Sequence, residues 1–237
     1  MTHIGRRAMI MAAGLGQRMR PLTNGTPKPL VEVAGVPLIE YGLGRLDQAG
    51  CDLAVVNVHY LPEQIEAWAR RKASPRIVIS DERRELLDTG GGIVKALPLL
   101  GNEPFFVVNS DSIWIDSGRP ALARLIARWD DARMDCLLLL CHPRRTIGYD
   151  GHGDFLTDAG GRIIGRPGRD ETGLAYIGAY LVHPRLFANV RLSKFSMNLL
   201  WDRAVAEKRL YGIEHEGRWL HVGTPEAIPL AERALGG

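Results

Sequence analysis

The chain has 237 residues, of which 46% are hydrophobic and 24% are charged, and its formal net charge at pH 7 is +3. This composition is typical of a globular protein, and the length suits one domain spanning residues 1–237. The net charge is small and the basic residues are scattered in groups of one to three, which argues against partners such as nucleic acid or a membrane surface.

The cysteines and the apolar runs of the sequence indicate in which cellular compartment the protein is expected. Three cysteines occur, Cys51, Cys136 and Cys141, and no pair has a CxxC spacing. The N-terminus leads into only a short apolar run, and no stretch reaches the roughly 18 apolar residues of a membrane span. We therefore expect a cytoplasmic protein with reduced thiols and no signal peptide.

Short apolar runs alternate with helical patterns along the chain. The runs are rich in Val, Ile and Leu without polar alternation, which is typical of strands buried on both faces by helices. This order predicts an α/β fold with a Rossmann-like, doubly wound and mainly parallel sheet. Expected strands are 8–12, 53–58, 76–80, 105–109, 136–141 and 175–182; expected helices are 37–48, 62–71, 93–97, 120–129, 197–208 and 225–235; and 148–168 is expected to form loop and hairpin.

A glycine-rich turn follows the first expected strand. Gly14-Leu15-Gly16 lies at the carboxyl end of that strand, where open α/β sheets bind ligands and glycines let backbone N–H groups approach a phosphate. Arg18 and Lys28 add two cations. The chain has no Walker A string, and Met19 stands where a dinucleotide fingerprint needs a third glycine, which argues against a nicotinamide-dependent oxidoreductase.

The string AAGLGQRM at 12–19, followed by PLT at 21–23 and PKPL at 27–30, resembles the signature of the sugar-1-phosphate nucleotidyltransferases. The resemblance implies an enzyme that joins an NTP to a sugar 1-phosphate and releases pyrophosphate. It implies the nucleotide-diphospho-sugar transferase fold without an appended β-helix, with a nucleotide-binding N-terminal half and a sugar-binding C-terminal half. Arg18 would stabilise the departing pyrophosphate, and Lys28 would lie near the α-phosphate and the sugar phosphate. The implied nucleotide-binding residues of this loop are Ala12, Ala13, Gly14, Leu15 and Gly16.

Asp111 follows the strand expected at 105–109, at the same sheet edge as the glycine turn. A carboxylate there is well placed to hold Mg²⁺ against phosphates, and the resemblance gives Asp111 that role. The family's second carboxylate lies in a late Trp-x-Asp-x-Gly-Thr-like string, where this chain has His221. Imidazole is a poor ligand for Mg²⁺, so four alternatives stay open. His221 acts through water, Asp111 and the phosphates suffice, Asp202 helps, or the ion is Mn²⁺.

The resemblance also assigns the base and sugar pockets. The stretch 81–93 would cradle the base, with Glu82, Thr89 and Gly90 as contacts. Independently of the resemblance, the three glycines 90–92 before the expected helix at 93–97 predict a helix-entry loop. Arg166 stands where the family has a basic residue before proline that contacts the sugar phosphate. The full set of expected sugar-binding residues is Asn109, Asp154, Arg166, Tyr176, Gly178 and Asn198.

Several short strings are most similar to the uridylyltransferases that act on N-acetylmuramate 1-phosphate in bacterial cell-wall sugar recycling. They are LDTGGGI at 87–93, VNSD at 108–111, GDF at 153–155 and FSMNLLWD at 195–202. We expect UTP and N-acetylmuramate 1-phosphate as substrates, with the mannose-1-phosphate guanylyltransferases as the alternative. His221 also motivates a remote alternative, a non-catalytic sugar-nucleotide sensor. A monomer or a small homo-oligomer is expected.

Overall fold

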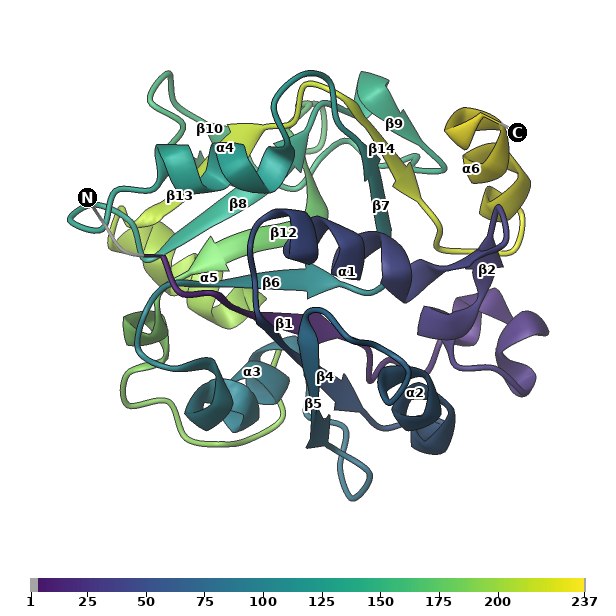
Figure 1. Ribbon diagram of the computed structural model, residues 1–237. Helices are drawn as coiled ribbons and strands as arrows, with labels where there is room; N and C mark the ends of the chain where they lie inside the picture. Colours follow the sequence, from purple (N-terminus) through teal and green to yellow (C-terminus); the bar gives the residue numbers. More distant parts are fainter. Residues whose placement is uncertain (1–3, 237) are drawn as a thin grey trace.

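A seven-stranded sheet forms the centre of the protein, whose computed structural model describes residues 4–236. The strand order is β13-β8-β12-β6-β1-β4-β5, as Figure 1 shows. The bounds are β1 Arg7–Met11, β4 Leu53–Val58, β5 Arg76–Asp81, β6 Phe105–Asn109, β8 Cys136–Cys141, β12 Ala175–Val182 and β13 Leu210–Glu214.

Four of the strand pairs in this sheet are parallel, and β12 runs antiparallel to both of its neighbours, β6 and β8. The expectation of a mainly parallel sheet is therefore confirmed. All six residues of β4 and of β8 are buried, as expected for strands covered on both faces. The same expectation is wrong for β5, which lies at the sheet edge and is mostly half-exposed.

Helices cover both faces of the sheet (Figure 1). The side chains of α1 (Leu38–Gln48), α2 (Pro62–Ala69) and α4 (Ala121–Arg128) pack on one face, and those of α3 (Asp88–Leu100) and α5 (Asn198–Ala206) pack on the other. Successive strand residues alternate between the two cores: Ala8 and Ile10 contact the first cluster, and Met9 contacts the second. Between residues 4 and 236, every helix is too short or too polar to span a bilayer.

A second, three-stranded sheet flanks the carboxyl end of β6. It has the order β7-β14-β9, with β7 at Ser112–Ile115, β14 at Arg218–His221 and β9 at Thr146–Ile147. Helix α6 (Ala227–Leu235) packs against β14. The register pairs His221 with Ser112, so the end of the chain is brought beside Asp111. Two short antiparallel pairs complete the strands: β2 (Glu32–Val33) with β3 (Val36–Pro37), and β10 (Leu156–Thr157) with β11 (Ile163–Gly165), the latter in the expected hairpin region.

The glycine triplet 90–92 lies inside α3, so its prediction as a loop before the helix is wrong. The physical reason is close packing. A Cβ atom at Gly90 would lie 2.2 Å from the Phe195 ring, and one at Gly91 would lie 2.1 Å from the Ser193 carbonyl oxygen. The glycines allow the segment 193–197 to lie directly on the first turn of α3.

Candidate active site

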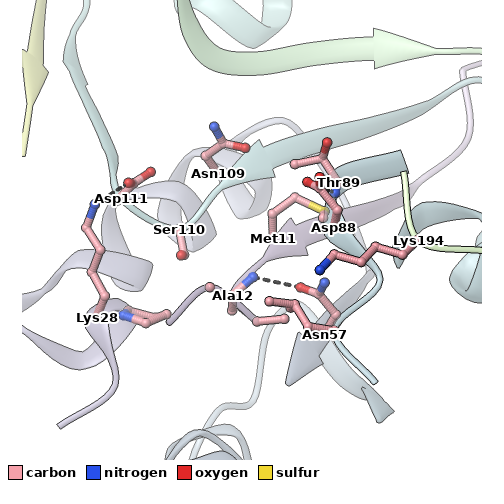
Figure 2. A pocket seen from close by; sticks show the side chains of 14 residues that line it. Met11, Ala12, Lys28, Asn57, Asp88, Thr89, Asn109, Ser110, Asp111 and Lys194 are labelled. Carbon is pink, nitrogen blue, oxygen red and sulfur yellow. Dashed lines mark hydrogen bonds and ion pairs between the residues drawn. The ribbon is translucent and has the colours of Figure 1, made fainter. Parts of the chain in front are cut away.

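The glycine-rich loop after β1 forms one wall of two adjoining cavities. Ala12, Ala13 and Gly14 line a cavity of about 340 Å³, seen in Figure 2. The rest of the loop, from Leu15 through Arg18, lines a second cavity of about 420 Å³. The loop turns at Gly16, whose φ of 62° lies in the left-handed region that favours glycine.

Lys28 and Asp111 meet where these two cavities join. The Lys28 Nζ lies 2.5 Å from the Asp111 Oδ2, and Figure 2 shows the pair at one end of the first cavity. Burial raises the pKa of Asp111, but the nearby Lys28 ammonium outweighs this, so the pKa of that carboxyl lies below its ordinary value. Asp111 is therefore ionised at neutral pH, and Lys28 holds it beside the glycine-rich loop.

His221 lies beside this pair and lines a fourth cavity, which shares Arg18 with the second. Burial lowers the pKa of His221, and the positive charges of Lys28 and Arg18 lower it further against the opposing effect of Asp111. The imidazole is therefore neutral at pH 7. Asp202 instead forms an ion pair with Arg166 at 3.0 Å. Within residues 4–236, Asp111, His221 and Asp202 do not gather into a metal-binding cluster, so the structure does not unite the three predicted ligands.

A buried hydrogen-bond network lies beneath the first cavity. The Asn57 Oδ1 accepts from the Ala12 backbone N–H at 2.7 Å, and the Asn57 Nδ2 donates to the Glu82 Oε1 at 2.8 Å. The Glu82 Oε2 accepts from the Leu87 backbone N–H at 3.0 Å. Glu82 is only 1% exposed, so its prediction as a base contact is wrong: both carboxylate oxygens are occupied inside the protein. Glu82 instead fixes Asn57 and the loop before α3.

Thr89 lies at the cavity wall, but Gly90 does not. The Gly90 backbone N–H donates to the Phe195 carbonyl at 2.9 Å, and the Phe195 ring covers its Cα. The Thr89 Oγ1 accepts from the Met197 backbone N–H at 2.8 Å while the residue lines both the first cavity and a third one. Gly90 is therefore needed for packing against Phe195, and its contact with the base stays a prediction.

The third cavity, of about 240 Å³, gathers most of the expected sugar-binding residues. Arg166 stacks over the Phe155 ring at 5.0 Å and donates to the Asn198 Oδ1 at 3.2 Å. Gly178 is not on the wall of this cavity. With a φ of 85°, it lets Ser112 approach, and a Cβ there would lie 2.7 Å from the Ser112 Oγ. The predicted residues that do line the cavity are Asn109, Asp154, Arg166, Tyr176 and Asn198.

The cavities form one continuous groove because neighbours share wall residues. The first and second share Gly14, Lys28 and Asp111, and the first and third share Met11, Thr89 and Asn109. Sequence reasoning missed four polar residues on the wall of the first cavity, which are Asn57, Asp88, Ser110 and Lys194. Asn57 had a usable signal, since it is the single polar residue in the otherwise apolar strand β4.

The nucleotidyl transferase family matches residues 7–235 of the chain. This protein belongs to that family. It is 45% identical over 232 residues to N-acetylmuramate alpha-1-phosphate uridylyltransferase of Caulobacter vibrioides, with 96% of each chain covered. It is 38% identical over 235 residues to the enzyme of the same name from Neisseria meningitidis serogroup B, covering 97% of this chain and 98% of the other.

A more distant relative agrees with this membership, and a solved structure shares the fold. The mannose-1-phosphate guanylyltransferase catalytic subunit beta of Drosophila melanogaster is 29% identical over 231 residues, covering 94% of this chain and 60% of the other. The crystal structure of UDP-glucose pyrophosphorylase complexed with UDP-glucose superposes with a TM-score of 0.79 at 18% identity, and 98% of each chain is covered. The fold of this nucleotidyl transferase is therefore the one expected from its sequence.

A divalent cation in this nucleotidyl transferase would find one carboxylate at the glycine-rich loop, that of Asp111. Nucleotidyltransferases of the family generally use divalent metal ions, and Mg²⁺ is usually bound by one or two carboxylates together with substrate phosphates and water. The described residues contain no group of three His, Cys, Asp or Glu side chains that could hold an ion alone. Asp111 therefore fits an ion that is shared with the phosphates of a substrate.

Proposed function

We propose that this protein condenses UTP with N-acetylmuramate 1-phosphate to give UDP-N-acetylmuramate and pyrophosphate, in the recycling of cell-wall sugars. The names of its two nearly full-length relatives support the substrates. The observation that carries the proposal is the continuous groove. It joins the glycine-rich loop and Arg18 at the second cavity to Arg166 at the third cavity, and the Lys28–Asp111 pair lies between them.

The chemistry requires two polyanions to be brought together. An oxygen of the sugar phosphate attacks the α-phosphorus of UTP, and pyrophosphate leaves from the opposite side. Because no covalent intermediate with the protein is needed, catalysis depends on positioning and on stabilising charge. The preorganised cations of the groove supply that stabilisation.

Each cation has a separate task in this scheme. Arg18 is exposed on the wall of the second cavity, where its guanidinium would bind the β- and γ-phosphates and stabilise the leaving pyrophosphate. Lys28 lies at the junction of the cavities, where its ammonium would bind the α-phosphate and the incoming sugar phosphate. Arg166 would hold the sugar phosphate from the third cavity, with its guanidinium fixed by Asn198 and Asp202.

Asp111 would hold Mg²⁺, or Mn²⁺ in its place, together with phosphate oxygens of the bound nucleotide. The ion would neutralise phosphate charge. Lys28 keeps the Asp111 carboxylate ionised and oriented until the nucleotide arrives. His221 stays neutral, so it adds no positive charge and can accept a hydrogen bond from a water molecule near Asp111.

The test is pyrophosphate release over a grid of UTP, GTP, CTP and dTTP against N-acetylmuramate, N-acetylglucosamine, glucose and mannose 1-phosphates, with Mg²⁺ and with Mn²⁺. Strong release with UTP and N-acetylmuramate 1-phosphate alone is the expected result. Strong release with GTP and mannose 1-phosphate would replace the proposed substrates by those of the guanylyltransferases. If no combination releases pyrophosphate with either metal, the proposed enzymatic activity is refuted and the sugar-nucleotide sensor becomes the favoured function. We also propose a cytoplasmic location, because the reaction consumes NTP, and a monomer or small homo-oligomer as the working form.

A further inference from the structure

Two side chains of opposite charge line the first cavity at the end away from the Lys28–Asp111 pair. They are Asp88, at the start of α3, and Lys194, in the segment before α5, and Figure 2 shows the Lys194 ammonium extending into the cavity. None of the ion pairs among residues 4–236 joins the two. The cavity therefore presents an acceptor and a donor that remain apart from each other.

The backbones of both residues are held in a fixed relation. The segment that carries Lys194 is tied to the start of α3, since the Phe195 N–H donates to the Leu87 carbonyl at 3.2 Å and the Gly90 N–H donates to the Phe195 carbonyl at 2.9 Å. Asp88 adopts a left-handed φ of 61°. Its Oδ1 accepts from the Thr89 N–H at 2.6 Å, which leaves its Oδ2 available to a ligand.

Two other polar side chains on the cavity wall have hydrogen bonds inside the protein. The Asn57 amide is occupied by Ala12 and Glu82, and the Thr89 hydroxyl accepts from Met197. Lys194 is exposed. Its ammonium and the Asp88 Oδ2 offer a donor beside an acceptor to the polar edge of a base lying in the cavity over Ala12.

We propose that Asp88 and Lys194 determine base specificity by recognising the imide edge of uracil. The Asp88 Oδ2 accepts from the uracil N3–H, and the Lys194 ammonium donates to the C4 carbonyl oxygen. Cytosine presents the reverse pattern, an acceptor at N3 and an amino group at C4, so it leaves both charged groups unpaired. Guanine presents the same donor–acceptor order as uracil at N1 and C6, so this pair separates oxo bases from amino bases. The inference rests on the proposed function for the placement of the nucleotide.

The experiment measures the Kd of UTP and of CTP by calorimetry without sugar phosphate, so that no turnover is needed. The wild type is expected to bind UTP more tightly than CTP. Lys194→Met removes a charge-assisted hydrogen bond and should weaken UTP binding on the order of tenfold while leaving CTP binding unchanged. Asp88→Asn tolerates the left-handed backbone and keeps an acceptor for the Thr89 N–H, but its amide can donate to cytosine N3. Asp88→Asn should therefore bring the Kd values of UTP and CTP closer together.

Arg191→Met is the matched control, because Arg191 is an exposed cation three residues before Lys194 and does not line the cavity. It should leave the ratio of the two Kd values at the wild-type value. Thermal midpoints of the Lys194 and Arg191 variants should match the wild type, since both side chains are exposed.

Two results would overturn the inference. If Lys194→Met weakens the binding of UTP and of CTP equally, Lys194 contacts the triphosphate and not the base. If the Kd of UTP is unchanged, Lys194 contacts neither the base nor the triphosphate. The outcome is separate from that of the proposed function. A wild type that binds UTP selectively but releases no pyrophosphate refutes the enzyme alone. A wild type that turns over UTP, with variants of unchanged base selectivity, refutes the base contacts alone.

Discussion

Gly91→Ala should destabilise the protein, although alanine is the better helix former. Gly91 lies inside α3, where helix propensity alone predicts a gain of about 1 kcal/mol. The added Cβ would lie 2.1 Å from the Ser193 carbonyl oxygen, a contact with backbone that no side-chain rotation can relieve. The segment 193–197 must therefore move by about 1 Å.

The cost follows from the hydrogen bonds that hold this segment. Its movement strains the Phe195–Leu87 and Gly90–Phe195 backbone bonds and the Met197–Thr89 bond. At roughly 1 kcal/mol each, their loss exceeds the helix gain by about 2 kcal/mol. A urea titration followed by tryptophan fluorescence measures the free energy of unfolding.

Gly44→Ala is the matched control for this experiment. Gly44 is an exposed residue inside α1, and a Cβ there would meet nothing within 4 Å. It should stabilise the protein by about 0.5–1 kcal/mol. If Gly91→Ala stabilises the protein to the same extent, the segment 193–197 does not pack on α3 as described, and the explanation for the glycine triplet is wrong.

Four further predictions concern the site and the pH dependence. Arg18→Ala should lower kcat/KM for pyrophosphate release roughly 10²–10³-fold with an unchanged thermal midpoint, since one electrostatic donor is lost from an exposed position; wild-type-like turnover would remove Arg18 from the mechanism. Asp111→Asn should abolish turnover across a titration of Mg²⁺ and Mn²⁺ while circular dichroism stays native, and an active variant would move the metal site elsewhere. Glu82→Gln should cost about 1–3 kcal/mol in urea titrations, because its amide turns a donor toward Asn57 or Leu87; unchanged stability would refute the closed network. Burial lowers the pKa of His215 and of His221. Below about pH 6.5 the unfolded chain therefore binds more protons than the folded chain, so the free energy of unfolding should fall as the pH is lowered from 7.5 to 5.5. A free energy of unfolding that stays constant or rises over this range would contradict these pKa shifts.

The sequence pattern predicted the strands and helices well where burial alone determines which residue types can occur. Continuous apolar runs such as 53–58 and 136–141 have one stable environment, the middle of a sheet covered on both faces. The direction of β12 could not be predicted in this way, because an antiparallel and a parallel central strand bury the same side chains. The triplet 90–92 was misassigned since glycine serves turns and close packing alike, and only the tertiary contact with 193–197 distinguishes the two.

For the candidate site too, the sequence predicted what depends on strand order and missed what depends on tertiary contacts. The glycine loop, Lys28 and Asp111 were predicted together because the carboxyl ends of neighbouring parallel strands meet at one sheet edge. Their chemical roles remain predictions. Lys194 was missed because no local pattern marks it: hydrogen bonds to residues about a hundred positions earlier bring it to the cavity. Glu82 was predicted to face the cavity but is buried beneath it, since sequence alone does not distinguish a buried carboxylate from an exposed one.

The order of strands in the sheet has a consequence for how the protein is made. The four neighbouring strands β6, β1, β4 and β5 are contained in residues 7–109, so this half of the sheet can assemble on the ribosome while the remainder is still being translated. The strand that starts beside Asp111, β7, gains its partner β14 only when residues 218–221 emerge. A nascent chain would thus acquire its glycine-rich loop early, and the groove beside Asp111 would be complete only near the end of synthesis.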